Sequence, residues 1–169
     1  SPGEASGPAS LTVDYPLDGT IFPPEIVPPT FLWHDPDAEA DTWLIDVAFA
    51  DDPEHIYVLS AGNSPAAGLI DPAVIATSNE IYRPTPYQAS AKSWAPNGEV
   101  WEAIKQGSTG RAANISIVGF RSTGPAKVKV LSRGRVSIAT SVDPVGAPIF
   151  YRDVPLAPAL TEKGVIKPP

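Results

Sequence analysis

Hydrophobic and polar positions alternate along this chain in short runs, and turn residues separate one run from the next. The clearest run is 42–49, TWLIDVAF, which places Trp43, Ile45 and Val47 on one face of a strand. The same pattern predicts strands at 11–15, 21–22, 30–33, 56–59, 113–120, 127–131 and 135–140. The 21 prolines and 13 glycines exclude long helices almost everywhere. The pattern therefore predicts an all-β fold.

Seven or eight short strands, with a turn about every 8 to 12 residues, favour an antiparallel sandwich of two sheets. A buried tryptophan on an early strand, Trp33 or Trp43, suits the core of such a fold. One short helix is expected at 98–106, where Asn97 is a suitable N-cap. The stretch 60–97 is irregular, and we expect it to be a long loop over the body of the domain.

Both ends of the chain have the composition of linkers. Residues 1–10, SPGEASGPAS, predict a flexible spacer of the kind that follows a removed signal or lipid anchor. Residues 157–169 predict an extended, proline-rich tail, so the domain itself is expected at 11–156. The sequence has no cysteine, so we expect no disulfides. It has no run of about 18 apolar residues, so we expect no membrane-spanning helix.

Charge is distributed unevenly along the chain, whose net charge is −7. Residues 1–82 contain fourteen acidic residues and no lysine or arginine, whereas 83–169 contain all twelve basic residues and five acids. Two interpretations are open: the halves interleave and neutralise each other, or the acidic half forms a face that steers a cationic partner. The basic residues are scattered and lack interleaved aromatics, which argues against a nucleic-acid partner.

An acidic stretch after the third expected strand has the spacing of calcium ligands. Asp35, Asp37, Glu39 and Asp41 stand at alternate positions, as oxygen ligands do in calcium loops. However, Ala40 occupies the position where an EF-hand loop needs glycine, and a strand follows instead of a helix. An acidic loop between strands is therefore the preferred interpretation, and calcium binding is the alternative.

No set of residues in the sequence predicts catalysis. His34 and His55 are the two histidines, and neither has a partner at metal-ligand spacing, so surface or hydrogen-bonded roles are expected. Glu99 and Glu102 could act as an acid–base pair, although they more simply complement the helix dipole. The chain also lacks a nucleophile elbow and a phosphate loop. We therefore expect a protein that is not an enzyme and has no cofactor.

Aromatic residues in the irregular region allow a second function. Tyr82, Tyr87, Trp94 and Trp101 could form a platform for sugars, in a carbohydrate-binding or surface-adhesion module. The simpler interpretation is a hydrophobic lid over one sheet.

The stretch 137–156, SIATSVDPVGAPIFYRDVPL, begins as a strand and continues past Asp143-Pro144 into an apolar arm. We expect the arm to fold back on the sandwich and the C-terminal tail to contact another subunit. The candidate interaction residues are Pro148, Ile149, Phe150, Tyr151, Arg152, Val165 and Ile166.

Several segments together resemble one bacterial module: YPLDGTIFPPEIVPPTFLW, TWLIDVAF, SWAPNGEVWEAIKQGS, ISIVGF and ATSVDPVGAPIFYRDVPL. This module is the N-terminal immunoglobulin- or fibronectin-III-like domain of exported bacterial proteins that carry c-type haem motifs and TolB-like propeller repeats. The resemblance covers residues 11–156 and is most specific in the last segment. It implies a sandwich fold and a periplasmic or extracellular location, at the outer face of the cytoplasmic membrane.

The resemblance also implies a function, although this sequence differs from its relatives in one respect. Relatives continue past the last segment into haem and propeller regions, but these 169 residues contain no cysteine that could attach a haem. What the resemblance implies is a non-enzymatic accessory subunit that docks on the periplasmic side of a cytochrome-containing electron-transfer complex, respiratory or photosynthetic. A c-type cytochrome subunit is the expected partner. The alternative is a remnant or fragment of a larger multihaem or propeller protein.

Overall fold

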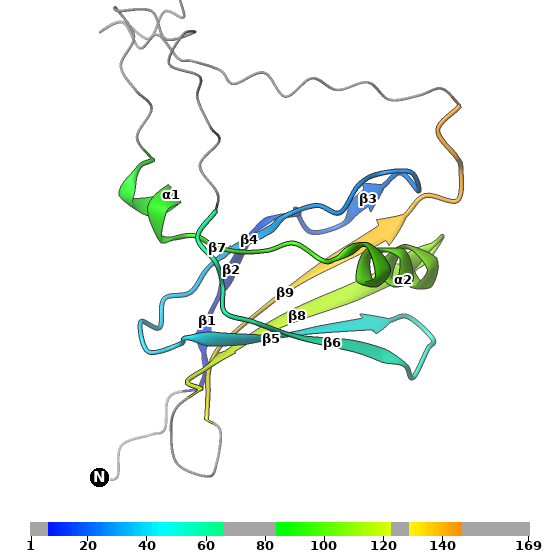
Figure 1. The fold of residues 1–169 in the computed structure, drawn as a ribbon. Coiled ribbons are helices and arrows are strands. Elements are labelled where there is room, and N and C mark those ends of the chain that lie inside the picture. Colours follow the sequence, from blue (N-terminus) through cyan, green and yellow to red (C-terminus); the bar gives the residue numbers. More distant parts are fainter. Residues whose placement is uncertain (1–6, 66–83, 123–128, 147–169) are drawn as a thin grey trace, which may run out of the picture.

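The computed structural model describes residues 7–65, 84–122 and 129–146, and these form two β-sheets and two helices (Figure 1). The fold is mostly β, as the sequence predicted. In chain order the elements are β1 (Ala9–Ser10), β2 (Thr12–Tyr15), β3 (Thr20–Phe22), β4 (Phe31–His34), β5 (Thr42–Phe49), β6 (His55–Ser60), α1 (Pro86–Ser90), β7 (Lys92–Trp94), α2 (Gly98–Ser108), β8 (Ala112–Phe120) and β9 (Val130–Thr140).

The larger sheet, called sheet A here, has the strand order β1-β9-β8-β5-β6, and β3 also pairs with β9. The pairs among β5, β6, β8 and β9 are antiparallel. However, β1 and β3 both pair with β9 in parallel, with Ala9 beside Ser132 and Thr20 beside Ile138. Sheet A is therefore mixed, and the prediction of a purely antiparallel fold is wrong at this edge.

The parallel edge arises because the first strands are divided between the two sheets. After β1 the chain leaves sheet A and forms β2, which pairs with β4 in the smaller sheet B, of order β2-β4-β7. It then returns to sheet A as β3. The turn before β3 also contacts β9: the Asp18 carboxylate accepts from the Ser137 amide at 2.8 Å, and the Gly19 amide donates to the Ser137 carbonyl at 2.8 Å.

The region 60–97, expected to be a loop, contains two elements in its described part. One is α1, and the other is β7, which pairs with β4 through Phe31 beside Trp94. The described residues therefore contain two helices, where the sequence predicted one. Both elements are too short to show a period of their own, since β7 has three residues and α1 has five.

The predicted helix is confirmed as α2. The Asn97 side chain accepts from the amide of Val100 at 2.8 Å, as expected of an N-cap, and the helix continues to Ser108. Trp101 and Ile104 are buried against the sheets, and the Trp101 indole donates to the Ile26 carbonyl at 2.9 Å. Helix α2 thus contributes one face to the core.

The two strands expected at 127–131 and 135–140 are, from Val130 onward, a single strand, β9. The residues between the two expected strands, 132–134, continue the strand without a break. A Cβ atom at Gly134 would lie 2.6 Å from the Leu11 carbonyl oxygen. Glycine is present there because the chain leaving β1 passes close by, not because the chain turns.

The hydrophobic core lies on one side of sheet A, between this sheet and a layer made of sheet B and α2 (Figure 1). Trp33, Trp43 and Trp101 are all fully buried in it. The rings of Trp33 and Trp43 meet edge to face at 5.8 Å, a favourable arrangement for aromatic pairs. Along β5, Trp43, Ile45 and Val47 point into the core as the alternation predicted.

The domain boundaries are corrected at one end. Ala9 and Ser10 form β1, so the spacer expected at 1–10 is too long. The tail at 157–169 and the end of the domain at 147–156 lie outside the described residues. Among the helices that the structure describes, none is long and apolar enough to cross a membrane.

Candidate functional site

The acidic loop between β4 and β5 uses its carboxylates to hold the fold together. Asp35 accepts from the Trp43 indole at 2.7 Å and also from the Ser132 hydroxyl. Gly119 makes room for these contacts, because a Cβ there would lie 2.6 Å from the Asp35 carboxylate. The loop is therefore joined to β5 and β9 through one partly buried carboxylate, which lies close to Gly119 of β8.

The other acids of this loop also have partners. Asp37 accepts from the amide of Glu39 at 2.9 Å, and Glu39 pairs with Arg121 at 3.0 Å. Asp41 accepts from the amide of Ser122 at 2.7 Å, and this bond, followed by one from Thr42, lowers the pKa of the Asp41 carboxyl. Within the described ranges no group of three or more His, Asp or Glu residues is placed to hold a metal ion. The calcium-like spacing of Asp35, Asp37, Glu39 and Asp41 thus corresponds to an acidic inter-strand loop.

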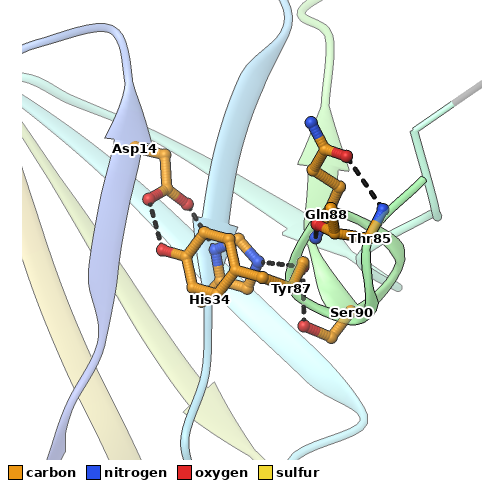
Figure 2. A network of polar contacts seen from close by, with 6 residues as sticks. All are labelled: Asp14, His34, Thr85, Tyr87, Gln88 and Ser90. Carbon is orange, nitrogen blue, oxygen red and sulfur yellow. Dashed lines mark hydrogen bonds and ion pairs between the residues drawn. The ribbon is translucent and has the colours of Figure 1, made fainter. Parts of the chain in front are cut away.

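A second polar cluster joins β2, β4 and α1 (Figure 2). His34 Nδ1 lies 2.5 Å from an Asp14 carboxylate oxygen, and His34 Nε2 lies 2.7 Å from the Tyr87 carbonyl oxygen. The Tyr87 hydroxyl donates to the other Asp14 oxygen at 2.8 Å. The two rings also stack, with centroids 3.7 Å apart and planes 18° from parallel. Sequence spacing gave no sign of this cluster, since Tyr87 is 53 residues from His34.

The geometry of this cluster holds α1 in place and does not favour catalysis. A histidine that acts as a general base needs one free nitrogen aimed at a reacting group. Both nitrogens of His34 face protein acceptors, so neither is free. The bond to Asp14 is the main cause that raises the pKa of the Tyr87 phenol, with smaller effects from desolvation and from the charge of Asp14. The phenol therefore remains a donor at neutral pH.

The other candidate residues for chemistry are also paired. His55 Nδ1 lies 2.7 Å from an Asp46 oxygen on the neighbouring strand, and the His55 ring stacks on Tyr57. Glu102 pairs with Lys105 at 2.6 Å, one turn further along α2. The proposed acid–base pair of Glu99 and Glu102 is therefore better explained as part of the charge pattern of a helix.

The alternative of a sugar platform gains no support from the residues that can be placed. Trp101 belongs to the core, and Trp94 packs on Phe31 with ring centroids 5.2 Å apart. Tyr87 lies on His34, and Tyr82 falls outside the described residues. The aromatics serve different parts of the fold, so they present no common flat surface.

A third feature is the side of sheet A that points away from the core. We call it the outer face of sheet A and define it by Leu44, Tyr57, Leu59, Val118, Arg133 and Arg135. Strand register places these residues in two neighbouring rows across β6, β5, β8 and β9, one running from Leu59 to Arg133 and the other from Tyr57 to Arg135. Sheet B and α2 both lie on the opposite side (Figure 1).

The two sides of this face differ in chemistry. At β6, Tyr57 is 62% exposed and Leu59 is 67% exposed. At β9, Arg133 and Arg135 are exposed, and neither has a carboxylate partner among the residues that the structure describes. Lys105, Arg111 and Arg121, by contrast, each pair with a carboxylate, as Arg111 does with Asp52 at 3.5 Å. The outer face of sheet A therefore combines exposed apolar side chains with unneutralised positive charge.

The two halves of the chain, so different in charge, are interleaved in sheet A. Strand β5 from the acidic half pairs with β8 from the basic half, and β9 pairs with β1 and β3. Two ion pairs also join the halves, Asp52 with Arg111 and Glu39 with Arg121. This arrangement agrees with neutralisation between the halves, the first of the two interpretations of the charge asymmetry.

The predicted interaction residues cannot be compared with this surface. Pro148, Ile149, Phe150, Tyr151, Arg152, Val165 and Ile166 all lie outside the described residues. The outer face of sheet A was not singled out from the sequence. The sequence did contain a signal for this face. Apolar residues stand at the outward positions of 42–49 and 56–59, where an alternating strand with one solvent-facing side would have polar residues.

Comparisons of the chain with models of protein families, with curated proteins and with solved structures found no match. The resemblance to the immunoglobulin- or fibronectin-III-like module of haem-carrying exported proteins therefore stays a prediction.

Proposed function

We propose that this chain is a non-catalytic interaction subunit that docks on a partner protein through the outer face of sheet A. The observation that carries the proposal is the uncovered pair of apolar residues Tyr57 and Leu59, on the same face as the unpaired Arg133 and Arg135. Exposed aromatic and apolar side chains beside arginine are typical of the residues that dominate binding energy in protein interfaces.

The positive charge of Arg133 and Arg135 indicates which side chains the partner surface should supply. Two exposed guanidinium groups without carboxylate partners favour a surface that supplies Asp or Glu side chains. The apolar residues favour a partner that also supplies apolar contacts. The proposed partner surface is therefore acidic at one end and apolar at the other, and it belongs to a folded protein.

The resemblance to the exported bacterial module supports a more specific form of the proposal. In this form the domain is an immunoglobulin- or fibronectin-III-like sandwich located outside the cytoplasmic membrane. Its partner is a c-type cytochrome subunit of an electron-transfer complex, contacted from the periplasmic side. Two sheets that enclose a tryptophan-rich core are compatible with this fold type.

The proposal is tested by capture from membranes of the organism that produces the chain. The tagged chain is compared with Leu59→Ser, with the double change Arg133→Glu and Arg135→Glu, and with Leu17→Ser. Leu17 is a matched control, because it is 69% exposed but lies in the turn before β3. Captured protein is identified by mass and by its haem absorbance.

We expect the wild-type chain and Leu17→Ser to retain the same haem protein. Leu59→Ser and the double arginine variant should weaken its capture about tenfold, which corresponds to about 1.4 kcal/mol. Equal capture by all variants would contradict docking through this face. Face-dependent capture of a protein without haem would contradict only the cytochrome part of the proposal.

A further inference from the structure

We propose that His34 is a pH-sensitive clamp, whose ring bonds helix α1 to sheet B through the Tyr87 carbonyl only while both ring nitrogens carry a proton. This inference goes beyond the proposed function and does not depend on it. It rests on the hydrogen-bond geometry of Asp14, His34 and Tyr87 (Figure 2).

The first step concerns the two contacts of the His34 ring. The group near Nδ1 is a carboxylate oxygen of Asp14, and the group near Nε2 is the carbonyl oxygen of Tyr87. Both groups can only accept while Asp14 is ionised. A neutral imidazole has a single N–H, so it can donate to one of them and must turn a lone pair toward the other. Both contacts are hydrogen bonds only in the doubly protonated ring.

The second step identifies the contact that is lost when the ring gives up one proton. A hydrogen bond to an ionised acceptor is stronger than one to a neutral carbonyl. The remaining proton therefore stays on Nδ1 with Asp14, and the Nε2 contact with the Tyr87 carbonyl becomes repulsive at 2.7 Å. That carbonyl also accepts from the Ser90 hydroxyl at 2.8 Å, so it remains bonded within α1 when it separates from His34.

The third step concerns the contacts that hold α1 on sheet B. The helix has five residues, and none of them is buried. Its capping bonds are internal: the Thr85 hydroxyl accepts from the Gln88 amide, and the Gln88 side chain accepts from the Thr85 amide. These bonds stabilise the helix itself and leave its docking to other contacts. Besides the His34 ring, the Tyr87 phenol contacts Asp14.

Among the described residues, the titratable groups in direct contact with the His34 ring come from two elements. Asp14 on β2 and Tyr87 on α1 make direct contacts with it. Lys92, on the adjacent strand β7, places its amine 5.7 Å from the Trp43 ring centroid, on the core side of the sheet. Asp35 follows His34 in sequence, but its carboxylate is bonded to Trp43 and Ser132. Among the described residues, Asp14 is therefore the carboxylate in direct contact with the ring.

His55 provides a matched control in the same molecule. It also contacts a carboxylate through Nδ1, at 2.7 Å from Asp46, and it also stacks on a tyrosine. Its Nε2 has no hydrogen bond to any residue in the described part of the chain. Loss of a proton from His55 therefore leaves its Asp46 contact intact and should move no helix.

The clamp is tested by NMR on the full chain across the histidine range, about pH 5 to 8.5. Imidazole ¹⁵N shifts report the protons on His34 and His55, and the NOE between the His34 and Tyr87 rings reports docking. We expect the NOE to weaken together with the loss of the second proton from His34. The Tyr87 amide resonance should shift over the same pH interval, and the protection of α1 amides should fall about fivefold.

Variants separate the clamp from a general effect of pH. In His34→Gln the Tyr87 amide should stay at its high-pH position at all pH values, and in His55→Gln it should behave as in the wild-type chain. The proposal is overturned if Tyr87 stays docked while His34 loses its second proton, or if the His34 ring is neutral throughout with α1 docked.

Discussion

At the scale of single residues, two buried tryptophans that look equivalent in the sequence differ in their polar contacts. The Trp43 indole donates to Asp35, whereas the Trp33 indole has no hydrogen-bond partner among the described residues. Both rings are fully buried, so replacement by phenylalanine removes similar packing. We expect Trp43→Phe to lower the free energy of unfolding by about 1 kcal/mol more than Trp33→Phe, because it leaves Asp35 with one donor fewer. Urea denaturation measures the difference, and equal losses would contradict it.

Asp41 supplies a second prediction at this scale. Its pKa is lowered chiefly by the hydrogen bond from the Ser122 amide, followed by the bond from Thr42. A carboxyl whose pKa is lower in the folded state stabilises the fold above its unfolded pKa, about 3.9, and loses this effect as pH falls through the folded value. The Ser122 amide resonance should therefore move only on the acid side of about pH 4. In Asp41→Asn that acid transition should be absent; a transition that persists would assign it to another carboxyl.

At the scale of elements, two glycines of α2 should respond in opposite ways to alanine. Alanine favours a helix over glycine by about 1 kcal/mol, so Gly98→Ala, where nothing lies within 4 Å of the new Cβ, should be neutral or stabilising. At Gly107 a Cβ would lie 2.5 Å from the Phe49 ring. We expect Gly107→Ala to destabilise the protein by about 1 to 3 kcal/mol through overpacking. Thermal unfolding of both variants is the measurement, and a stabilised Gly107→Ala would show that α2 packs less closely on β5.

The elements that the sequence predicted well are those with a period long enough to show. Strand β5 alternates over eight residues, and α2 has an N-cap and an amphipathic face over eleven. Strand β7 and helix α1 are shorter than one clear period, and they exist because β4 and Asp14 provide partners distant in sequence. The two strands expected at 127–131 and 135–140 are one strand from Val130 onward, and Gly134 within it allows the chain after β1 to pass close by, a contact that no local pattern reveals.

The candidate sites show the same contrast between contacts within a short stretch of sequence and contacts between distant residues. The role of the acidic loop could be anticipated, because Asp residues between strands commonly bond to nearby amides. The contact of Asp35 with Ser132 joins residues 97 positions apart, and that of His34 with Tyr87 spans 53. Local spacing contains no information on such contacts, since they depend on which strands become neighbours.

At the scale of the whole molecule, one side of sheet A packs on the core, and the other, which the described residues leave exposed, is the proposed docking face. The inner side contacts sheet B and α2 through the tryptophan core, whereas Tyr57, Leu59 and Arg135 point away from it. Substitution of exposed residues typically changes stability by less than about 0.5 kcal/mol. We therefore expect Leu59→Ser and Arg135→Glu to unfold like the wild-type chain while they lose partner binding. A large loss of stability in either variant would assign these side chains to the fold instead.

The most direct test of docking through the outer face of sheet A is site-specific photocrosslinking in the organism that produces the chain. Benzoylphenylalanine is placed at Leu59 or at Leu17, two positions of nearly equal exposure on different surfaces. Docking through this face predicts a single crosslinked protein from Leu59, none from Leu17, and loss of the product when Arg133→Glu and Arg135→Glu are added. A crosslink from Leu17 but not Leu59, or no crosslink from either position, would contradict it.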